Sequence, residues 1–250
     1  MTKYYLIPPK LYDDQFWWKT DDIEFWKTKL LHDTKQSILE LAAGTGRIAY
    51  PLIRESAKYT GIELSKIYAD YANKKIMTIS TSSTVIEGDM RDFNLDKFYK
   101  YIFIGFNSFL HLLNESDAIK CLQSIKAHMD EDSILYLDLF VPKSDFLYRT
   151  NNQKMNILTF HDSVLKKPVD IIETLEYDSN CEIMSIEWNY LSNKKLVYPK
   201  FDFKMKMYYP ESIHKILDLS GFSINNMWGT YEQEKFTENS ELQIYECILN

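Results

Sequence analysis

The chain has 250 residues, of which 45% are hydrophobic and 26% charged, and these values are typical of a soluble globular protein. Its formal net charge of -7 would repel a phosphate backbone, so nucleic acid is disfavoured as a partner. The three cysteines form no CxxC pair, which argues against a zinc site and fits the reducing cytoplasm. No apolar run approaches the roughly 20 residues of a membrane span.

The N-terminal 35 residues are rich in aromatic side chains. Pro8 and Pro9 interrupt this segment before a signal-peptide core could form. Part of the segment is expected to be helical, and its eight aromatic residues are Tyr4, Tyr5, Tyr12, Phe16, Trp17, Trp18, Phe25 and Trp26. Such a segment would suit a lid that closes a dry, cation-tolerant pocket.

Five mostly apolar runs in the first half of the chain are typical of strands that are covered on both faces. They are SILEL (37–41), YTGIEL (59–64), STVIEG (83–88), YIFIGF (101–106) and SILYLDLF (133–140). Helical or loop segments alternate with these runs. The alternation predicts an α/β fold with a parallel sheet and right-handed crossovers.

Two helices are predicted between these strands. The helix after Ser65 places three residues near one face: Ile67, Tyr71 and Ile76. The helix after Asn114, which is a suitable N-cap, has an apolar face made of Ile119, Leu122, Ile125 and Met129.

From residue 155 to residue 209 the side chains alternate with period two and no helix intervenes. The runs VDIIETLEYD, EIMSIEWNYL and FDFKMKMYYP predict antiparallel strands that are joined by turns. Glu187 and Trp188 in the second run could face a pocket, although a strand that dimerises or merely caps is the better interpretation. The sequence therefore leaves a homodimer open.

The last 41 residues return to the earlier pattern. Pro210 begins a predicted helix that Gly221 ends, with Ile213, Ile216 and Leu217 on its apolar face. Two strand-like runs, FSINNMWG and ELQIYECIL, complete the chain.

Residues that are suited to ligand binding or catalysis follow the predicted strands at the point where each strand ends. They are Glu40, Gly44 and Gly46 after the first strand, Glu63 after the second, Asp89 and Met90 after the third, and Phe106 and His111 after the fourth. Ligands of an open parallel sheet bind outside the carboxyl ends of its strands, so we expect these residues to surround a ligand.

Two ligands suit this arrangement. Residues 44–49, GTGRIA, match the GxGxxA dinucleotide pattern, and Glu63 could accept both hydroxyl groups of a ribose in NAD or in S-adenosylmethionine. Glu40, however, would repel a pyrophosphate and attract a sulfonium or an α-amino group. Asp89 could accept the adenine amino group while Met90 packs on the ring. The residues therefore favour S-adenosylmethionine.

The sequence resembles the class I, Rossmann-like S-adenosylmethionine-dependent methyltransferases over nearly its whole length. ILELAAGTGR resembles their first motif, GIELS the second, EGDMRDF the third and FNSFLHLLNESDAIKCLQSI the fourth. The segments YDDQFWWKTDDIEFW, LDLFVP and YYPESIHKILDLSGFSINNMWGTY resemble the small-molecule branch that includes glycine/sarcosine and aminosugar N-methyltransferases.

The resemblance implies a seven-stranded, mostly parallel sheet with helices on both faces, an antiparallel β insert and an N-terminal helical lid. It implies a single domain over residues 1–250. Within it, residues 1–35 form the lid, 36–150 the cofactor-binding core, 151–209 the antiparallel cap and 210–250 the completion of the core sheet.

The resemblance also implies roles for residues at matching positions. The expected cofactor contacts are Tyr12, Trp18, Glu40, Ala42, Gly44, Gly46, Arg47, Glu63, Leu64, Asp89, Met90 and Phe106. In this set the glycine turn would meet the methionine part, Glu63 the ribose, and Asp89 with Met90 the adenine. One departure from the family is Ala42, which stands where relatives have their first glycine.

We therefore expect in-line methyl transfer from S-adenosylmethionine to a small molecule, with nitrogen favoured over oxygen and S-adenosylhomocysteine as product. His111 is the candidate base, and no metal and no membrane are expected. Two other classes stay open: a non-catalytic protein that binds S-adenosylmethionine, and an NAD-dependent oxidoreductase.

Overall fold

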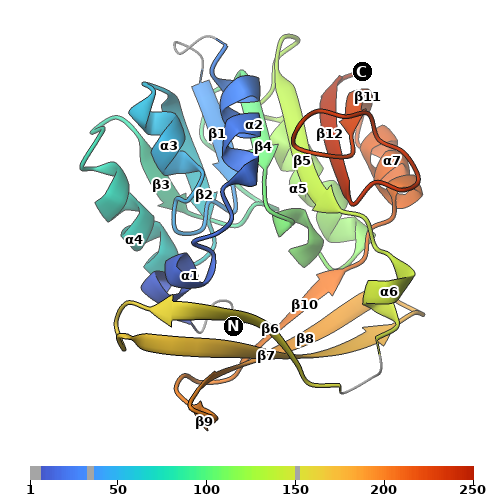
Figure 1. The fold of residues 1–250 in the computed structure, drawn as a ribbon. Helices are drawn as coiled ribbons and strands as arrows, with labels where there is room; N and C mark the ends of the chain where they lie inside the picture. The colour runs from blue at the N-terminus through green and yellow to red at the C-terminus, as the bar shows by residue number, and fades with distance from the viewer. Residues whose placement is uncertain (1–6, 33–36, 150–152) are drawn as a thin grey trace. The chain divides into compact units, whose positions relative to one another are not determined.

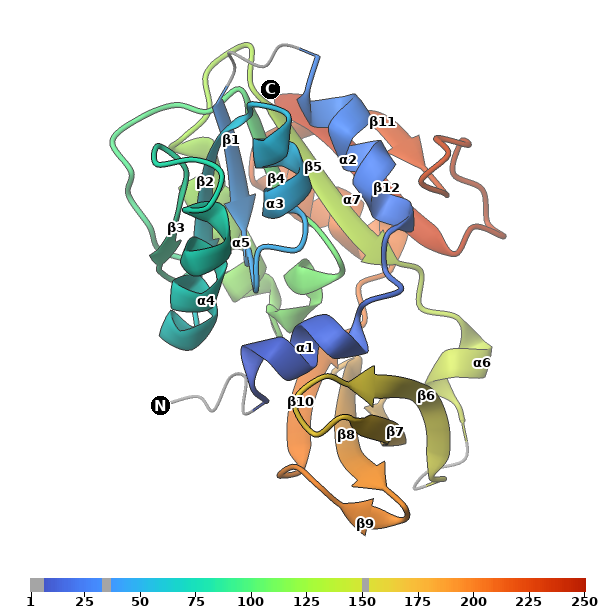
Figure 2. The same ribbon diagram turned by 60° about the vertical axis from the view of Figure 1, so that its left-hand side comes forward.

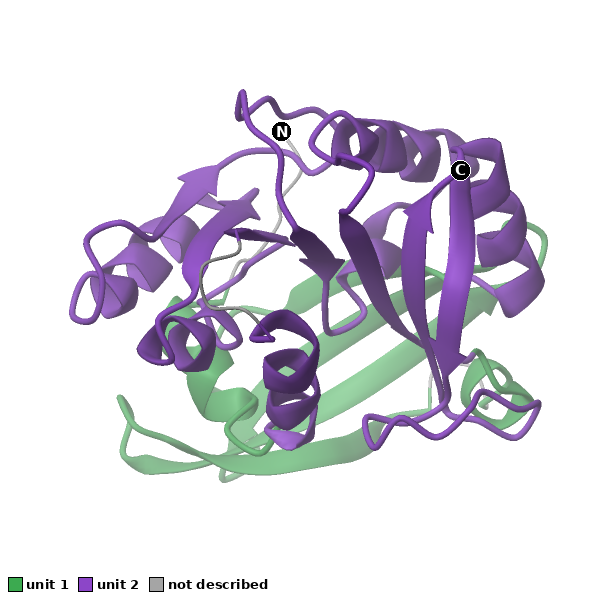
Figure 3. Cartoon of the chain, turned by 90° about the horizontal axis from the view of Figure 1, so that it is seen from above, with its two compact units in different colours: residues 1–19, 142–207 green, residues 20–141, 208–250 purple. Residues whose placement is uncertain are grey.

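The computed structural model describes residues 7–32, 37–149 and 153–250. The chain divides into two compact units (Figure 3): unit 1 comprises residues 1–19 and 142–207, and unit 2 comprises residues 20–141 and 208–250. Tyr4 and Tyr5 of the predicted lid, and its last residues, lie outside the described ranges.

Unit 2 contains a seven-stranded sheet in the order β11-β12-β5-β4-β1-β2-β3 (Figure 1). The strands are β1 (Ser37–Leu41), β2 (Lys58–Glu63), β3 (Thr84–Glu87), β4 (Tyr101–Ile104), β5 (Ile134–Phe140), β11 (Phe222–Trp228) and β12 (Leu242–Leu249). β12 runs antiparallel to both of its neighbours, and the other pairs are parallel. The predicted Rossmann-like sheet is confirmed.

Helices cover both faces of this sheet. They are α2 (Asp21–Leu30), α3 (Ala49–Arg54), α4 (Lys66–Ile76), α5 (Glu115–Lys126) and α7 (Pro210–Leu219), with a short 3-10 helix η1 (Ser108–His111). Figures 1 and 2 show α2, α3 and α4 on one face, and α5 and α7 on the other. None of the helices in the described part of the chain is long and apolar enough to cross a membrane.

The predicted apolar face is confirmed for α5, where Leu122 and Ile125 are buried, and is partly wrong for α4. Asn114 caps α5 as expected, because its Oδ1 accepts the N–H of Asp117 at 2.9 Å. On α4 the expectation for Ile67 fails, because Ile67 is 66% exposed. The face that Ile76 shares by helical spacing is instead made of Tyr68, Ala69 and Ala72.

Helix α2 packs into the core of unit 2. Trp26 is fully buried, with its ring centre 4.7 Å from that of Phe103 on β4, and Phe25 lies edge-on to Trp228 at 5.7 Å. These aromatic contacts place α2 with the sheet, so the predicted lid of residues 1–35 is divided between the two units at residue 19.

Unit 1 contains an antiparallel sheet in the order β10-β8-β7-β6, with β9 paired to β8. Its elements are α1 (Pro9–Gln15), α6 (Ser144–Leu147), β6 (Met155–Asp162), β7 (Lys167–Asp178), β8 (Ile183–Ser192), β9 (Lys195–Leu196) and β10 (Phe201–Lys206). The three predicted antiparallel strands are confirmed. β6 was not predicted, because a bulge between Asn156 and Leu158 interrupts its alternation.

Candidate functional site

The candidate site lies at the carboxyl ends of β1 and β4 in unit 2. β1 pairs with β2 on one side and with β4 on the other, so the strand order reverses between β1 and β4. Ligand crevices of open α/β sheets form at such a point. The residues that follow these strands are therefore the candidates for ligand contact.

The turn after β1 has three residues in left-handed backbone conformations. Ala42, Gly44 and Gly46 have φ values of 57°, 58° and 76°. A Cβ on Gly46 would lie 3.3 Å from the Cβ of Ala72 on α4, so the absence of a side chain lets the turn approach that helix. Ala42 adopts its conformation at a steric cost of about 1–2 kcal/mol. The turn presents bare backbone to a ligand.

Glu63, at the end of β2, is a buried carboxylate that faces this turn. Its Oε2 accepts the N–H of Gly44 and its Oε1 accepts the N–H of Ser65, both at 2.8 Å. Burial raises the pKa of Glu63, and the backbone hydrogen bonds oppose that shift. Glu63 thus shapes the glycine turn, a role that the sequence did not reveal, in addition to its proposed role toward a ribose.

Glu40, near the end of β1, is buried on the same side of the sheet. The Tyr59 hydroxyl donates to Glu40 Oε2 at 2.5 Å. Burial raises the pKa of Glu40 to about 8, the hydrogen bond from Tyr59 and the charge of Arg47 lower it, and the charges of Asp22 and Glu63 raise it further. At neutral pH the carboxyl group is therefore mostly protonated, in contrast to the charge that was predicted for Glu40 from the sequence.

Arg47 is held by a carboxylate from α2. Its guanidinium donates to both carboxylate oxygens of Asp22, at 2.7 Å and 2.6 Å, and Asp22 is fully buried. The guanidinium also lies 5.0 Å from the ring centre of Phe106. Arg47 thereby joins the glycine turn to α2 and to the end of β4.

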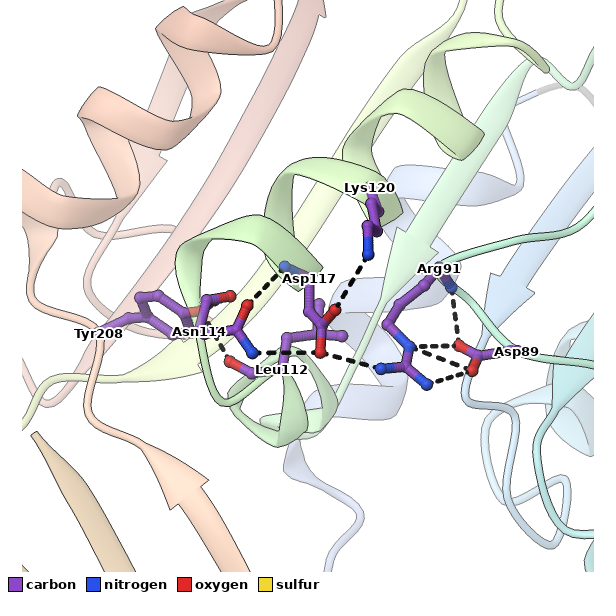
Figure 4. Close-up of polar contacts among 7 residues, drawn as sticks. All are labelled: Asp89, Arg91, Leu112, Asn114, Asp117, Lys120 and Tyr208. Atoms are coloured by element: carbon purple, nitrogen blue, oxygen red, sulfur yellow. Dashed lines mark hydrogen bonds and ion pairs between the residues drawn. The ribbon is translucent and has the colours of Figure 1, made fainter. Parts of the chain in front are cut away.

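Asp89, after β3, is paired with a cation (Figure 4). Its carboxylate accepts three side-chain contacts from Arg91, the shortest at 2.6 Å from Nη2, and also the Arg91 backbone N–H at 2.9 Å. Arg91 Nη1 donates to Asp117 Oδ2 on α5 at 2.9 Å. The hydrogen bonds from Arg91 lower the pKa of Asp89. The Asp89 oxygens would therefore accept the proposed adenine amino group in addition to the N–H groups of Arg91.

The end of β4 is stabilised by an aspartate from β5. Phe106 and Asn107 have left-handed φ values of 50° and 62°, which end the strand two residues earlier than predicted. Asp138 Oδ2 accepts the N–H of Phe106 at 2.9 Å and the hydroxyl of Tyr231 at 2.9 Å. The Phe106 backbone is thus fixed beside the turn that carries Arg47.

The remaining predicted residues are placed as follows. Leu64 is 43% exposed beyond β2, and Met90 is partly buried beyond Asp89. His111 ends η1 and is also partly buried, and its catalytic role stays a prediction. Tyr12 and Trp18 belong to unit 1, so their proposed closure over a cofactor stays a prediction.

Backbone hydrogen bonds bring the predicted strand ends together. The Ala43 N–H donates to Ile62 O, and the Gly88 N–H donates to Glu63 O, both at 3.0 Å. The glycine turn, Glu63 and the segment before Asp89 are therefore neighbours. Among the described residues, no group of three or more His, Cys, Asp or Glu is placed to hold a metal ion.

Three residues of this edge escaped the sequence argument. Asp22, Tyr59 and Arg91 each hold a predicted site residue by a hydrogen bond. Asp89 and Arg91 are two residues apart, so their ion pair could have been predicted from the sequence. Asp22 comes from a segment with no motif pointing to Arg47, and the Tyr59 contact depends on the register between two strands.

Comparison with known proteins identifies the family of the central segment. Residues 38–132 match a family described as a methyltransferase domain. Cypemycin N-terminal methyltransferase from a Streptomyces species is 24% identical over 107 residues, which are 43% of each chain. The dTDP-3-amino-3,4,6-trideoxy-alpha-D-glucopyranose N,N-dimethyltransferase of Streptomyces venezuelae is 26% identical over 102 residues, 41% of each chain. The matched segment therefore spans less than half the length of these relatives.

Solved structures resemble the fold over nearly the whole chain. The CcbJ methyltransferase of Streptomyces caelestis has a TM-score of 0.79 at 19% identity, covering 98% of this chain and 97% of that one. CalS10 of Micromonospora echinaspora, an amino pentose methyltransferase solved with bound S-adenosylmethionine, has a TM-score of 0.70 at 12% identity, covering 100% and 99%. Residues 38–132 thus match a methyltransferase domain, and the whole chain has the Rossmann-like fold of these solved methyltransferases.

Proposed function

We propose that the protein transfers a methyl group from S-adenosylmethionine to an amine of a small molecule. The observation that carries this proposal is the pair of buried carboxyl groups, Glu40 and Glu63, on either side of a glycine turn. A cation beside Glu40 would favour the ionised form of that group and the Glu63 carboxylate would accept a ribose hydroxyl, whereas a phosphate would lie against the negative charge of Glu63. This donor set therefore favours S-adenosylmethionine over NAD.

The residues present fit this cofactor. The Glu63 carboxylate accepts the backbone N–H groups of Gly44, Ser65 and Leu64, and its remaining lone-pair site would accept a ribose hydroxyl. Glu40 would face the cationic groups of the methionine part, which would lie on the backbone of Gly44. Asp89 with Met90 would take the adenine, and Leu64 would pack on it.

When bound, the cofactor supplies a methyl group that its sulfonium already activates, so the protein mainly contributes alignment and a dry site. Phe106, whose backbone Asp138 fixes, would line the face where transfer occurs. An amine acceptor must lose its proton before it attacks. His111, five residues after Phe106, is the group that we assign to that step.

The names of two relatives support nitrogen as the acceptor atom. One acts on the N-terminus of cypemycin, and the other is an N,N-dimethyltransferase of a nucleotide-linked amino sugar. An acceptor of the second kind is a small molecule, and the net charge of -7 weighs against nucleic acid.

We also propose a cytoplasmic location, which the free state of all three cysteines supports. Light scattering on the purified protein would show whether it forms a homodimer, which the sequence leaves open.

Methyl transfer can be tested directly with methyl-labelled S-adenosylmethionine and a panel of amines and phenols that includes nucleotide-linked amino sugars. We expect label in at least one amine, and Glu63→Gln should raise the KM for the cofactor. Glu131→Gln, which removes an exposed carboxylate in a distant turn, is the matched control and should behave like the wild type. Tight cofactor binding without transfer to any acceptor would favour the non-catalytic alternative instead.

A further inference from the structure

Tyr59 and Glu40 form a buried hydrogen-bonded pair next to the glycine turn. Their side chains are 2% and 3% exposed, and the Tyr59 hydroxyl donates to Glu40 Oε2 at 2.5 Å. The two residues come from adjacent parallel strands, β1 and β2, in which Glu40 lies opposite Gly61. Burial of a tyrosine hydroxyl at this distance from a carboxyl group fixes the position of that group.

Gly61 makes the contact possible. Tyr59 and Gly61 are two residues apart on β2, so they share a face of the sheet. A Cβ on Gly61 would lie 2.8 Å from the Tyr59 hydroxyl oxygen and 2.9 Å from the Cβ of Ala43, closer than real Cβ contacts. The tyrosine therefore occupies the space that a side chain at residue 61 would need.

Four charged or titratable groups act on Glu40 from the elements around it. Tyr59 and Glu63 belong to β2, Arg47 to the glycine turn, and Asp22 to α2. Arg47 is already paired with Asp22 at 2.6–2.7 Å, so its charge is largely balanced. Glu40 as an anion would thus be a buried charge without a cation of its own, which is costly.

We propose that Tyr59 is a positioning residue, which holds Glu40 so that its carboxyl group gives up a proton to solvent when the cationic methionine part of S-adenosylmethionine binds beside it. This inference rests on the proposed function. The carboxyl O–H bond breaks, the proton passes to buffer, and the carboxylate that remains accepts the Tyr59 hydroxyl and faces the cofactor's positive charge. Burial, which raises the pKa of Glu40 to about 8, keeps this carboxyl group mostly protonated at pH 7 before the cofactor binds.

Proton release can be measured by titration calorimetry of S-adenosylmethionine binding at pH 7 in buffers of different ionisation enthalpy. The wild type should release close to one proton for each cofactor bound, because a group with a pKa of about 8 is about nine-tenths protonated at that pH. Glu40→Gln should bind without this release. Binding of the cofactor to the wild type with no proton release would overturn the inference.

The role of Tyr59 is tested by the pH dependence of affinity. Tyr59→Phe removes a hydrogen bond that stabilises ionised Glu40 more than neutral Glu40, so the pKa of Glu40 in the free protein should rise by about one unit. The Kd for S-adenosylmethionine should then exceed that of the wild type about tenfold at pH 6 and about twofold at pH 9. Ionisation of the cofactor itself is common to both proteins and cancels in the ratio.

Tyr245→Phe is the matched control. Tyr245 is fully buried on β12 of the same sheet, and its hydroxyl donates to Gln243 Oε1 at 2.8 Å. This variant should keep the wild-type Kd at every pH. A ratio for Tyr59→Phe that stays constant with pH would show a merely structural role and overturn the inference. Failure of the wild type to bind S-adenosylmethionine at all would contradict the proposed function, and the inference with it.

Discussion

Removal of one partner of the ion pair between Asp22 and Arg47 should cost far more stability than removal of one partner of a surface ion pair. Asp22 is fully buried and the Arg47 side chain is 17% exposed, and the pair is bidentate at 2.7 Å and 2.6 Å. Asp22→Asn removes the negative charge and leaves a buried guanidinium that is only partly satisfied. Removal of one partner of a buried pair costs about 3–5 kcal/mol. Because one acceptor oxygen remains, we expect the lower end, about 3 kcal/mol.

Thermal unfolding followed by circular dichroism would measure this cost. For a chain of 250 residues, about 3 kcal/mol corresponds to a decrease in Tm of roughly 6–12 °C. Because Arg47 follows Gly46, we also expect the variant to bind S-adenosylmethionine less tightly. The matched control is Asp70→Asn on α4, whose pair with Lys66 spans 3.1 Å between side chains that are 55% and 65% exposed.

The control variant should change stability by no more than about 1 kcal/mol. A Tm for Asp22→Asn within the error of the Asp70→Asn value would contradict this expectation, because it would mean that a buried guanidinium without its partner costs no more stability than an exposed ammonium without its partner. Combining Asp22→Asn with Arg47→Gln should cost less than the sum of the two single changes, since the second change removes the uncompensated charge.

Three further predictions concern the same edge. Glu63→Gln places an amide N–H₂ against the backbone N–H of either Gly44 or Ser65, so the free energy of unfolding should fall by about 1–3 kcal/mol, seen as a lower Tm in differential scanning fluorimetry. An unchanged Tm would mean that these hydrogen bonds do not shape the turn. Ala42→Gly relieves a φ of 57° and should raise stability by about 0.5–1 kcal/mol in urea unfolding, whereas a loss would show that Ala42 is not strained. The pKa of Glu40 is raised in the folded protein from 4.5 to about 8, so its contribution to stability is present below pH 4.5 and is lost as the pH rises through about 8. Relative to Glu40→Gln, the free energy of unfolding of the wild type should fall by roughly 3–6 kcal/mol between pH 4.5 and about 8, as measured by denaturant unfolding at each pH. Parallel pH profiles of the two unfolding free energies would contradict this prediction.

Much of the fold could be predicted from local patterns. β1, β5 and β12 match their predicted runs to within a residue, because a strand that is buried on both faces needs a continuous apolar run. β4 is shorter than predicted because the left-handed backbone of Phe106 and Asn107, which Asp138 holds, ends it early. That aspartate lies on another strand, so no pattern near Phe106 could reveal it.

The arrangement of the candidate site was predictable where it depends on residues at the ends of predicted strands. Glu63 and the glycine turn follow from strand ends and spacing, and the structure places them in contact. The contacts of Glu40 were not predictable. Its neutral state depends on burial, on a tyrosine from the next strand and on a helix that the sequence assigned to a lid. Those contacts are set by tertiary packing rather than by neighbours in the chain.

The identity of the cofactor can be tested by a calorimetric titration of the wild-type protein with S-adenosylmethionine, with NAD as the comparison. The proposed function predicts saturable binding of S-adenosylmethionine in a one-to-one ratio, weakened in Glu63→Gln, and no binding of NAD. Binding of NAD without binding of S-adenosylmethionine would contradict it.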